Sequence, residues 1–311
     1  MTRIGTSDLD VFPLNLGGNV FGWTADRDAS FRILDAFVDG GGDFIDTADV
    51  YSAWAPGNSG GESERIIGDW LSTRAPEGVV VATKVGQHPD HAGLAPDTVR
   101  AAVEASLERL GTTTIDLLYA HRDDPDTPLD ETVAAFGALV DDGIVRHTAL
   151  SNYSAERIRE WIDTARRLGV PEPVALQPHY NLVERDAEAD VLPEARAHGL
   201  GILPYYALAS GFLTGKYRAG SVDDSSPRAG GAAKYATSQG LATVDALERV
   251  ARARGASIAT IALAWLRAQP GVVAPIASAS RPEQIPDLLA AGRLDLAPEE
   301  IAEIDRVSQP E

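Results

Sequence analysis

Three residues that could carry out acid–base chemistry stand at the ends of three apolar runs. They are Asp46 in GDFIDT, Lys84 in GVVVATK and His121 in IDLLYAH. Lys84 is one of only three lysines in a chain that has 24 arginines, and an unpaired ammonium at the end of a buried strand would cost several kcal/mol. Neighbouring strands lie about 4.8 Å apart, so successive parallel strands would place Asp46 beside Lys84, and Lys84 near His121. We therefore predict that Lys84 pairs with Asp46.

The loop that follows Asp46, DTADVYS, brings Tyr51 over the same strand ends. A tyrosine has an ordinary pKa of about 10, and a neighbouring ammonium is expected to lower that pKa. We predict that Tyr51 is a general acid, a role typically worth about 10² to 10⁴ in rate, and that His121 helps to donate or relay the proton. Taken singly, Asp46 could cap a helix, and Tyr51 or His121 could be a core side chain. Their occurrence together at consecutive strand ends favours the chemical role.

Eight short runs rich in β-forming residues recur along the chain, and amphipathic patterns of helical period lie between them. The runs are residues 11–17, 42–47, 78–84, 115–121, 144–151, 173–178, 200–206 and 272–278. Strands that alternate with helices favour a parallel sheet, and eight is the number that closes a barrel. We predict an α/β fold in which residues 1–311 form a single (β/α)8 TIM barrel domain. The carboxyl ends of its strands would form the face that carries the chemistry.

Three further parts of the chain lie outside this repeat. Residues 2–11 indicate an N-terminal β-hairpin that could close the floor of the barrel, and residues 281–292 and 297–308 indicate two additional C-terminal helices. The connection over residues 207–237 has no strong period, and a connection of this length in a compact domain is usually functional.

A doubly wound dinucleotide-binding sheet is the main alternative, but its glycine motif is absent. Gly17, Gly18 and Gly22 after the first run have the wrong spacing for G-x-G-x-x-G. A phosphate loop is also excluded, because Gly211 and Gly215 are one residue too close together and no Ser or Thr follows Lys216.

The composition limits the classes of partner. A net charge of −19 repels phosphate, so binding to nucleic acid or to an anionic membrane is not expected, and any anionic ligand needs a local cluster of positive groups. The first ten residues lack the apolar centre of a signal peptide, and charges interrupt the longest apolar stretches too soon for a membrane span. We therefore expect a cytoplasmic protein. With no cysteines, disulfides and thiol chemistry are excluded.

The sequence resembles the aldo-keto reductase family over nearly its whole length. FIDTADVYS resembles the Asp–Tyr segment of that family, TK its lysine strand and YAHRDD its histidine strand. This resemblance implies a catalytic tetrad of Asp46, Tyr51, Lys84 and His121. Further blocks that resemble the family, in the same order, are GGESERIIGDWL, LSNYS, LQPHYNL, LASGFLTGKY and PIASASRPEQ.

The resemblance also implies a nicotinamide dinucleotide as cofactor, usually NADPH, bound across the carboxyl face. By position, Ser151, Asn152 and Gln177 would hold the carboxamide, and Tyr205 would stack on the nicotinamide ring. Leu208, Gly211 and Lys216 fall where the pyrophosphate would lie. Without the resemblance, Tyr205 could be a core side chain, and Ser151 and Asn152 could cap the helix that follows.

The adenosine end departs from the family pattern, because the usual lysine is absent and leucine replaces the usual asparagine. The corresponding residues are Ser278, Ser280, Arg281, Gln284 and Asp287, followed by Leu288. Arg281 at a helix start can still bind a 2′-phosphate, and Arg228 in the long connection could close over it. NADPH is therefore favoured, with NADH as the alternative. The usual Ser-Pro after the stacking aromatic is replaced here by Tyr206 and Ala207.

The expected reaction is the reduction of an aldehyde or ketone, or the reverse oxidation of an alcohol, on a small-molecule substrate. Trp23, Trp54 and Tyr206 are predicted to wall the substrate pocket. No metal is expected, since the carboxylates of HRDDPDTPLDE have no second histidine nearby. Nothing in the sequence sets an oligomeric state.

Two other functions are open at this point. The chain also resembles potassium-channel β subunits, which implies that it could be a redox-sensing protein that holds NADPH with little turnover. Lys84 could alternatively form a Schiff base in a barrel isomerase or lyase, although pairing with Asp46 would keep the amine protonated and unreactive.

Overall fold

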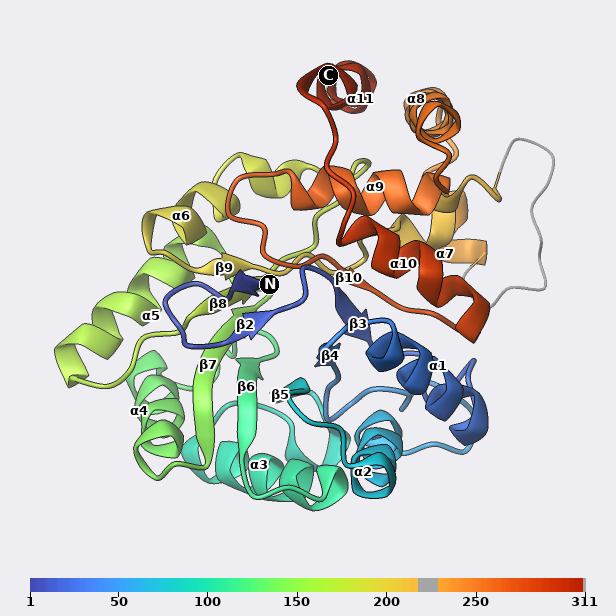
Figure 1. Ribbon diagram of the computed structural model, residues 1–311. Helices are drawn as coiled ribbons and strands as arrows, with labels where there is room; N and C mark the ends of the chain where they lie inside the picture. The colour runs from blue at the N-terminus through green and yellow to red at the C-terminus, as the bar shows by residue number, and fades with distance from the viewer. Residues whose placement is uncertain (218–228, 310–311) are drawn as a thin grey trace.

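The computed structural model describes residues 1–217 and 229–309, in which eight parallel strands form one curled sheet (Figure 1). The strands are β3 (Asn15–Gly17), β4 (Phe44–Asp46), β5 (Val80–Val85), β6 (Ile115–Ala120), β7 (Val145–Ser151), β8 (Ala175–Gln177), β9 (Gly201–Ile202) and β10 (Ile276–Ala277). Their spatial order is β10-β3-β4-β5-β6-β7-β8-β9. A parallel bridge between Ile202 and Val272 joins the two ends of this order. The predicted (β/α)8 fold is confirmed.

Seven of the eight runs identified in the sequence contain a whole strand, and β5 extends one residue beyond its run, to Val85. The strands are shorter than the runs because residues at one or both ends of each run lie outside the paired part of the sheet. β7 is the longest match, with seven residues inside the run 144–151. All six residues of β5 are buried, as in a strand covered on both faces.

Helices surround the ring of strands on its outer side (Figure 1). The helices are α1 (Arg27–Asp39), α2 (Glu62–Arg74), α3 (Pro96–Leu110), α4 (Leu129–Asp141), α5 (Ala155–Leu168), α6 (Val191–Ala197), α8 (Ser238–Arg254), α9 (Ile258–Arg267), α10 (Ile285–Ala291) and α11 (Pro298–Ser308). Short 3₁₀ turns are η1 (Pro89–His91), η2 (Asp186–Glu188) and η4 (Pro282–Gln284). Caps define the helix ends: Ser154 accepts a hydrogen bond from the backbone N–H of Arg157 at the start of α5, and Gly169 ends that helix with a positive φ.

The N-terminal hairpin closes one end of the ring, as expected. It consists of β1 (Thr2–Arg3) and β2 (Asp10–Val11), which pair antiparallel, and Figure 1 shows it lying across the centre of the ring. Ile4, Leu9 and Val11 are buried in one cluster with barrel residues such as Leu117. This plug leaves the opposite, carboxyl end of the ring for a site.

Both C-terminal patterns form helices, as expected. α10 lies beside α9 and α1, whereas α11 packs on α8 (Figure 1). The connection over residues 207–237 carries more structure than its sequence indicated, with η3 (Ala209–Thr214) and the short α7 (Ala229–Ala233). No helix within residues 1–217 and 229–309 is long and apolar enough to cross a bilayer.

Candidate active site

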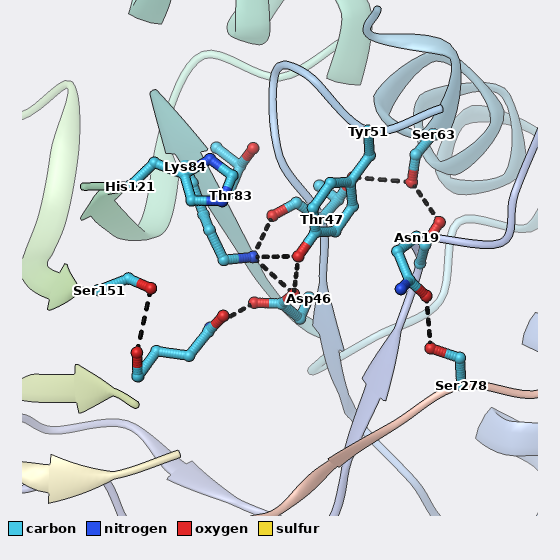
Figure 2. Close-up of polar contacts among 12 residues, drawn as sticks. Asn19, Asp46, Thr47, Tyr51, Ser63, Thr83, Lys84, His121, Ser151 and Ser278 are labelled. Carbon is cyan, nitrogen blue, oxygen red and sulfur yellow. Dashed lines mark hydrogen bonds and ion pairs between the residues drawn. The ribbon is translucent and has the colours of Figure 1, made fainter. Parts of the chain in front are cut away.

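The ammonium of Lys84 lies at the centre of a buried polar cluster (Figure 2). Its Nζ donates to Asp46 Oδ2 at 2.6 Å, to the backbone oxygen of Thr47 at 2.8 Å and to the hydroxyl of Tyr51 at 2.9 Å. Lys84 is fully buried and Asp46 is 1% exposed. The predicted pair therefore exists, and all three donors of the ammonium are used.

Asp46 is held from two sides. Its Oδ2 accepts from Lys84 and, at 3.3 Å, from the hydroxyl of Tyr51, while its Oδ1 accepts from Gln177 Nε2 at 2.8 Å. These three hydrogen bonds fix the orientation of the carboxylate. Asp46 ends β4 and Gln177 ends β8, so the contact spans the mouth of the barrel.

The phenol of Tyr51 and the imidazole of His121 both stay uncharged near neutral pH. Burial, followed by the negative charge of Asp46, raises the pKa of Tyr51 well above 10.0. The expected lowering of this pKa by Lys84 was wrong, because burial and the adjacent carboxylate outweigh the ammonium. Burial also lowers the pKa of His121 well below 6.5, and the charge of Lys84 acts in the same direction. Burial likewise lowers the pKa of Lys84, while Asp46 opposes that shift.

His121 stands immediately after β6, on the same face as Tyr51. Its backbone N–H donates to Val85 at 3.1 Å, which continues the β5–β6 ladder by one residue. The ring centroids of His121 and Tyr51 are 6.1 Å apart. Nδ1 of His121 is buried and has no hydrogen-bond partner among residues 1–217 and 229–309.

A cavity of about 740 Å³ opens over this cluster. Asp46, Tyr51 and His121 line it, whereas Lys84 lies beneath its floor and does not. A Schiff base between Lys84 and a molecule in this cavity is therefore disfavoured. Of the predicted cofactor residues, those that line the cavity are Ser151, Asn152, Gln177, Tyr205, Leu208, Gly211, Lys216, Ser278, Ser280 and Gln284.

Three predicted cofactor residues lie elsewhere. Arg281 and Asp287 are exposed and do not line the cavity, although Arg281 directly follows the cavity residue Ser280. Arg228 lies outside the described residues.

Hydrogen bonds tie the strand ends around the cavity together. Asn152, which has a positive φ of 60°, donates to the backbone oxygen of His121 at 2.9 Å and accepts from the hydroxyl of Tyr205 at 2.8 Å. Ser151 donates to the backbone oxygen of Gln177 at 3.0 Å. Neither Ser151 nor Asn152 caps α5, since Ser154 does. Tyr205 stacks on His179 with ring centroids 5.2 Å apart, and its ring also borders the cavity.

The segment around η3 shapes the far end of the cavity through unusual backbone angles. Tyr206, Ala209 and Ser210 all have a positive φ, as does Gly211, and such angles in non-glycine residues cost of order 1 kcal/mol or more each. A Cβ on Gly211 would approach Lys216 Cε to 3.2 Å. Lys216 makes no ion pair with residues 1–217 or 229–309. The ammonium of Lys216, beside the space left by the absent side chain of Gly211, fits the charge and size of a diphosphate.

A model of the aldo/keto reductase family matches residues 13–309. The chain belongs to the aldo/keto reductase family. The resemblance inferred from the sequence is thereby confirmed, and members of this family generally use NADPH or NADH.

Several named relatives are similar over almost the whole aldo/keto reductase chain. A probable voltage-gated potassium channel β subunit of Oryza sativa subsp. japonica is 34% identical, covering 99% of this chain and 96% of the relative. An uncharacterised oxidoreductase of Bacillus subtilis (strain 168) is 34% identical, covering 95% and 91%. L-glyceraldehyde 3-phosphate reductase of Escherichia coli (strain K12) is 30% identical, covering 97% and 90%. Together with the family, the reductases among them support carbonyl reduction as the general chemistry.

The three aromatic residues predicted for the substrate pocket all line the cavity of this aldo/keto reductase. Trp23 and Trp54 meet edge to face at 5.7 Å, and Trp54 lies 6.0 Å from the ring of Tyr51. Trp54 is 49% exposed and Tyr206 is 53% exposed. The cavity therefore has an apolar mouth next to the phenol.

Other cavity residues of the aldo/keto reductase were not foreseen. They are Gly17, Asn19, Thr24, Val50, Gln87, Arg122, Ala207, Ser210, Thr214, Gly231, Ile276 and Ala277. Only the positions of Gln87 and Arg122 in the sequence indicated that they could line the cavity, because Gln87 follows Lys84 by three residues and Arg122 directly follows His121.

The acidic residues after β6 hold the loop in place. Asp123 pairs with Arg157, and Asp124 accepts from the backbone N–H of Leu94.

A second buried carboxyl group, Asp49, lies behind the cluster in the aldo/keto reductase. Its Oδ2 accepts from the backbone N–H groups of Gly86 and His88, at 3.1 and 3.4 Å, while its Oδ1 has no partner in the described ranges. Burial, followed by the negative charge of Glu64, raises the pKa of Asp49 to about 7. The folded protein then holds a proton that the unfolded chain releases, so Asp49 lowers the free energy of unfolding as the pH rises from 3.8 to about 7.

We expect Asp49→Asn to become more stable relative to the unsubstituted protein as the pH rises. The amide cannot ionise, and its oxygen can still accept from Gly86 and His88. Urea unfolding at pH 5 and pH 8 should show the stability difference moving in favour of the variant by about 3 kcal/mol, since the two units from pH 5 to the pKa of about 7 count roughly 1.4 kcal/mol each. Asp163→Asn on the exposed face of α5 is the control. A stability difference that is equal at both pH values would contradict the titration of Asp49.

Proposed function

We propose that this aldo/keto reductase interconverts a carbonyl compound and an alcohol with NADPH, using Tyr51 as the general acid or base. The observation that carries the proposal is the contact of Lys84 Nζ with both Asp46, at 2.6 Å, and the hydroxyl of Tyr51, at 2.9 Å, beside a cavity of about 740 Å³. When bound, the nicotinamide dinucleotide would supply the hydride. The protein must then supply a proton to the carbonyl oxygen.

Tyr51 suits the role of proton donor in the reduction. Its raised pKa keeps the proton on the phenol until a carbonyl oxygen arrives, and the hydroxyl borders the cavity. As the proton leaves, negative charge grows on an oxygen that already accepts from Lys84 at 2.9 Å. The interaction therefore strengthens in the transition state, which is what lowers a barrier. Asp46 keeps the ammonium charged and in place.

His121 suits the role of orienting the carbonyl. A neutral imidazole carries one N–H donor, and this ring faces the cavity next to Tyr51. The N–H and the phenol could hold one carbonyl oxygen between them. Ser151, Asn152 and Gln177 line the adjacent cavity wall, in keeping with the proposed carboxamide site, and Lys216 with Gly211 would receive the diphosphate.

The test is a panel of aldehydes, ketones and alcohols, each with NADPH and with NADH, followed by absorbance of the reduced nicotinamide. We expect substrate-dependent consumption of NADPH that matches the alcohol formed. Cofactor binding without turnover on the whole panel would favour the second candidate, a redox-sensing or regulatory NADPH-binding protein. The likeness to the rice protein named as a probable channel β subunit favours that candidate.

Arg281 is proposed to select NADPH over NADH. Its side chain is exposed and has no ion pair in the described ranges, and its backbone N–H, like that of Ser280, donates to Gln284 Oε1. We expect Arg281→Ala to raise the Kd for NADPH about 10-fold, because a charge-assisted contact is worth roughly 1.5–3 kcal/mol. The Kd for NADH should change less than about twofold. Fluorescence titration measures both, with the exposed Arg306→Ala as control. Equal losses for both cofactors would contradict the assignment.

A further inference from the structure

Arg122 is a positively charged residue in the cavity wall, directly after His121, that the proposed mechanism does not use. Its side chain is exposed, and it lines the cavity together with His121 and Tyr205. Within residues 1–217 and 229–309 it makes no hydrogen bond or ion pair through its side chain. Most other arginines in the described part of the chain do pair with a carboxylate, as Arg109 does with Glu64.

The carboxylates nearest to Arg122 in the sequence, Asp123 and Asp124, make their hydrogen bonds to other groups and form no ion pair with Arg122. Asp123 receives two hydrogen bonds of 2.8 Å from Arg157. Asp124 accepts from the backbone N–H groups of Leu94 and Asp126 and from the hydroxyl of Thr127. The guanidinium of Arg122 therefore has no ion-pair partner among residues 1–217 and 229–309, and it lines the cavity.

Gln87, in the loop after the neighbouring strand β5, also lines the cavity and has no side-chain hydrogen bond to a described residue. The other amides in the cavity wall differ, since all of them make side-chain hydrogen bonds; they are Asn19, Asn152, Gln177 and Gln284. One guanidinium and one neutral amide form a donor set that suits a single negative charge. A guanidinium fork matches the two oxygens of a carboxylate.

The rest of the wall indicates what should carry that charge. Trp23, Trp54 and Tyr206 give the mouth of the cavity an aromatic surface next to Tyr51. Asp46 is the one carboxylate of the described chain in the cavity wall, and Lys84 pairs with it. Because the net charge of −19 repels anions at long range, an anionic substrate needs a local cation such as this one.

We propose that Arg122, assisted by Gln87, selects carbonyl substrates that combine an apolar body with a carboxylate. The inference rests on the proposed carbonyl reduction and adds the substrate class. Arg122 acts in substrate binding and not in proton transfer, so its effect falls mainly on KM. Salt should weaken the preference, since an exposed charge pair is screened over about 10 Å at 0.1 M ionic strength.

The test compares 4-formylbenzoate with its methyl ester, which differs from it mainly in charge. We expect kcat/KM to favour the acid over the ester by about 10-fold or more, and Arg122→Gln to remove most of that preference. Arg122→Lys should restore part of it, because the charge returns without the fork. Arg32→Gln removes the same charge from an exposed site on α1 and should keep the preference within about twofold. A preference that survives Arg122→Gln, or none in the unsubstituted protein, would overturn the proposal.

Binding measurements separate failure of this inference from failure of the proposed reaction. If neither aldehyde is reduced, calorimetry can compare benzoate with benzamide on the protein in the presence of NADP⁺ and in its absence. We expect benzoate to bind more tightly, and Arg122→Gln to weaken benzoate about 5-fold or more while benzamide changes little. Equal affinity of benzoate for the two proteins would refute the role of Arg122 whether or not the protein is a reductase.

Discussion

Tyr51→Phe is expected to lower kcat for carbonyl reduction by about 10²-fold to 10⁴-fold, the usual contribution of a general acid. The variant keeps the ring that packs against Trp54 and His121 but loses the hydroxyl that accepts from Lys84 and borders the cavity. Lys84 would retain its contacts with Asp46 and with the backbone oxygen of Thr47. We therefore expect the Kd for NADPH to stay within about twofold of the unsubstituted value. Steady-state kinetics and fluorescence titration measure the two quantities separately.

Tyr153→Phe is the matched control for this experiment. Tyr153 is 4% exposed, its ring packs edge to face on Trp161, and its hydroxyl has no partner among the described residues. Removing this hydroxyl should leave kcat unaffected within about twofold, because no contact is lost. If Tyr51→Phe retained kcat at the level of this control, Tyr51 would not be the proton donor.

Lys84→Met is expected to lower both activity and stability. The substitution leaves Asp46 buried without its ammonium, and breaking a buried ion pair from one side typically costs about 3–5 kcal/mol. It also removes the donor that stabilises the developing phenolate of Tyr51, so kcat should fall by a factor of at least about 10². Urea unfolding at pH 8 gives the stability change, and steady-state kinetics give the activity.

The double substitution Lys84→Met with Asp46→Leu separates these two effects. Replacing both members of a buried pair by apolar side chains is often neutral for stability, so the double variant should recover most of the lost free energy of unfolding. Its activity should stay as low as that of Lys84→Met. Recovery of activity along with stability would show that the pair only supports the fold, and a cost below about 1 kcal/mol for the single variant would contradict a buried charge pair.

The residues of the proposed catalytic cluster that lie at strand ends could be predicted from the sequence, because each is a polar residue that directly follows an apolar run. Asp46, Lys84 and His121 end three successive runs, and the parallel register then brings them together with no further information. The barrel follows from the same pattern, since eight such runs alternate with helical periods. Local patterning was sufficient wherever neighbouring strands were also consecutive in the chain.

Features that depend on contacts across the barrel could not be predicted in this way. The hydrogen bond from Gln177 to Asp46 joins residues 131 positions apart, and no local pattern marks it. The raised pKa of Tyr51 depends on how deeply the phenol is buried, which its loop sequence does not reveal. Asp123, which directly follows Arg122, pairs with Arg157 and not with Arg122, and these two partners are 34 positions apart in the sequence.

The backbone conformation near η3 could not be predicted from the sequence either. Tyr206, Ala209 and Ser210 have a positive φ although none of them is glycine. Their residue types therefore do not indicate this backbone conformation. The shape of the cavity at this end depends on the surrounding structure, which holds these residues in their strained conformations.

Deuterium transfer tests the central claim most directly. The protein is mixed, in excess over a carbonyl compound, with NADPH that carries deuterium at the transferable position, and the alcohol formed is analysed by mass spectrometry and NMR. We expect one deuterium on the carbinol carbon with the unsubstituted protein and almost none with Tyr51→Phe in the same time, although both bind NADPH. Bound NADPH with no deuterium transfer in the unsubstituted protein, or equal transfer in the two proteins, would contradict it.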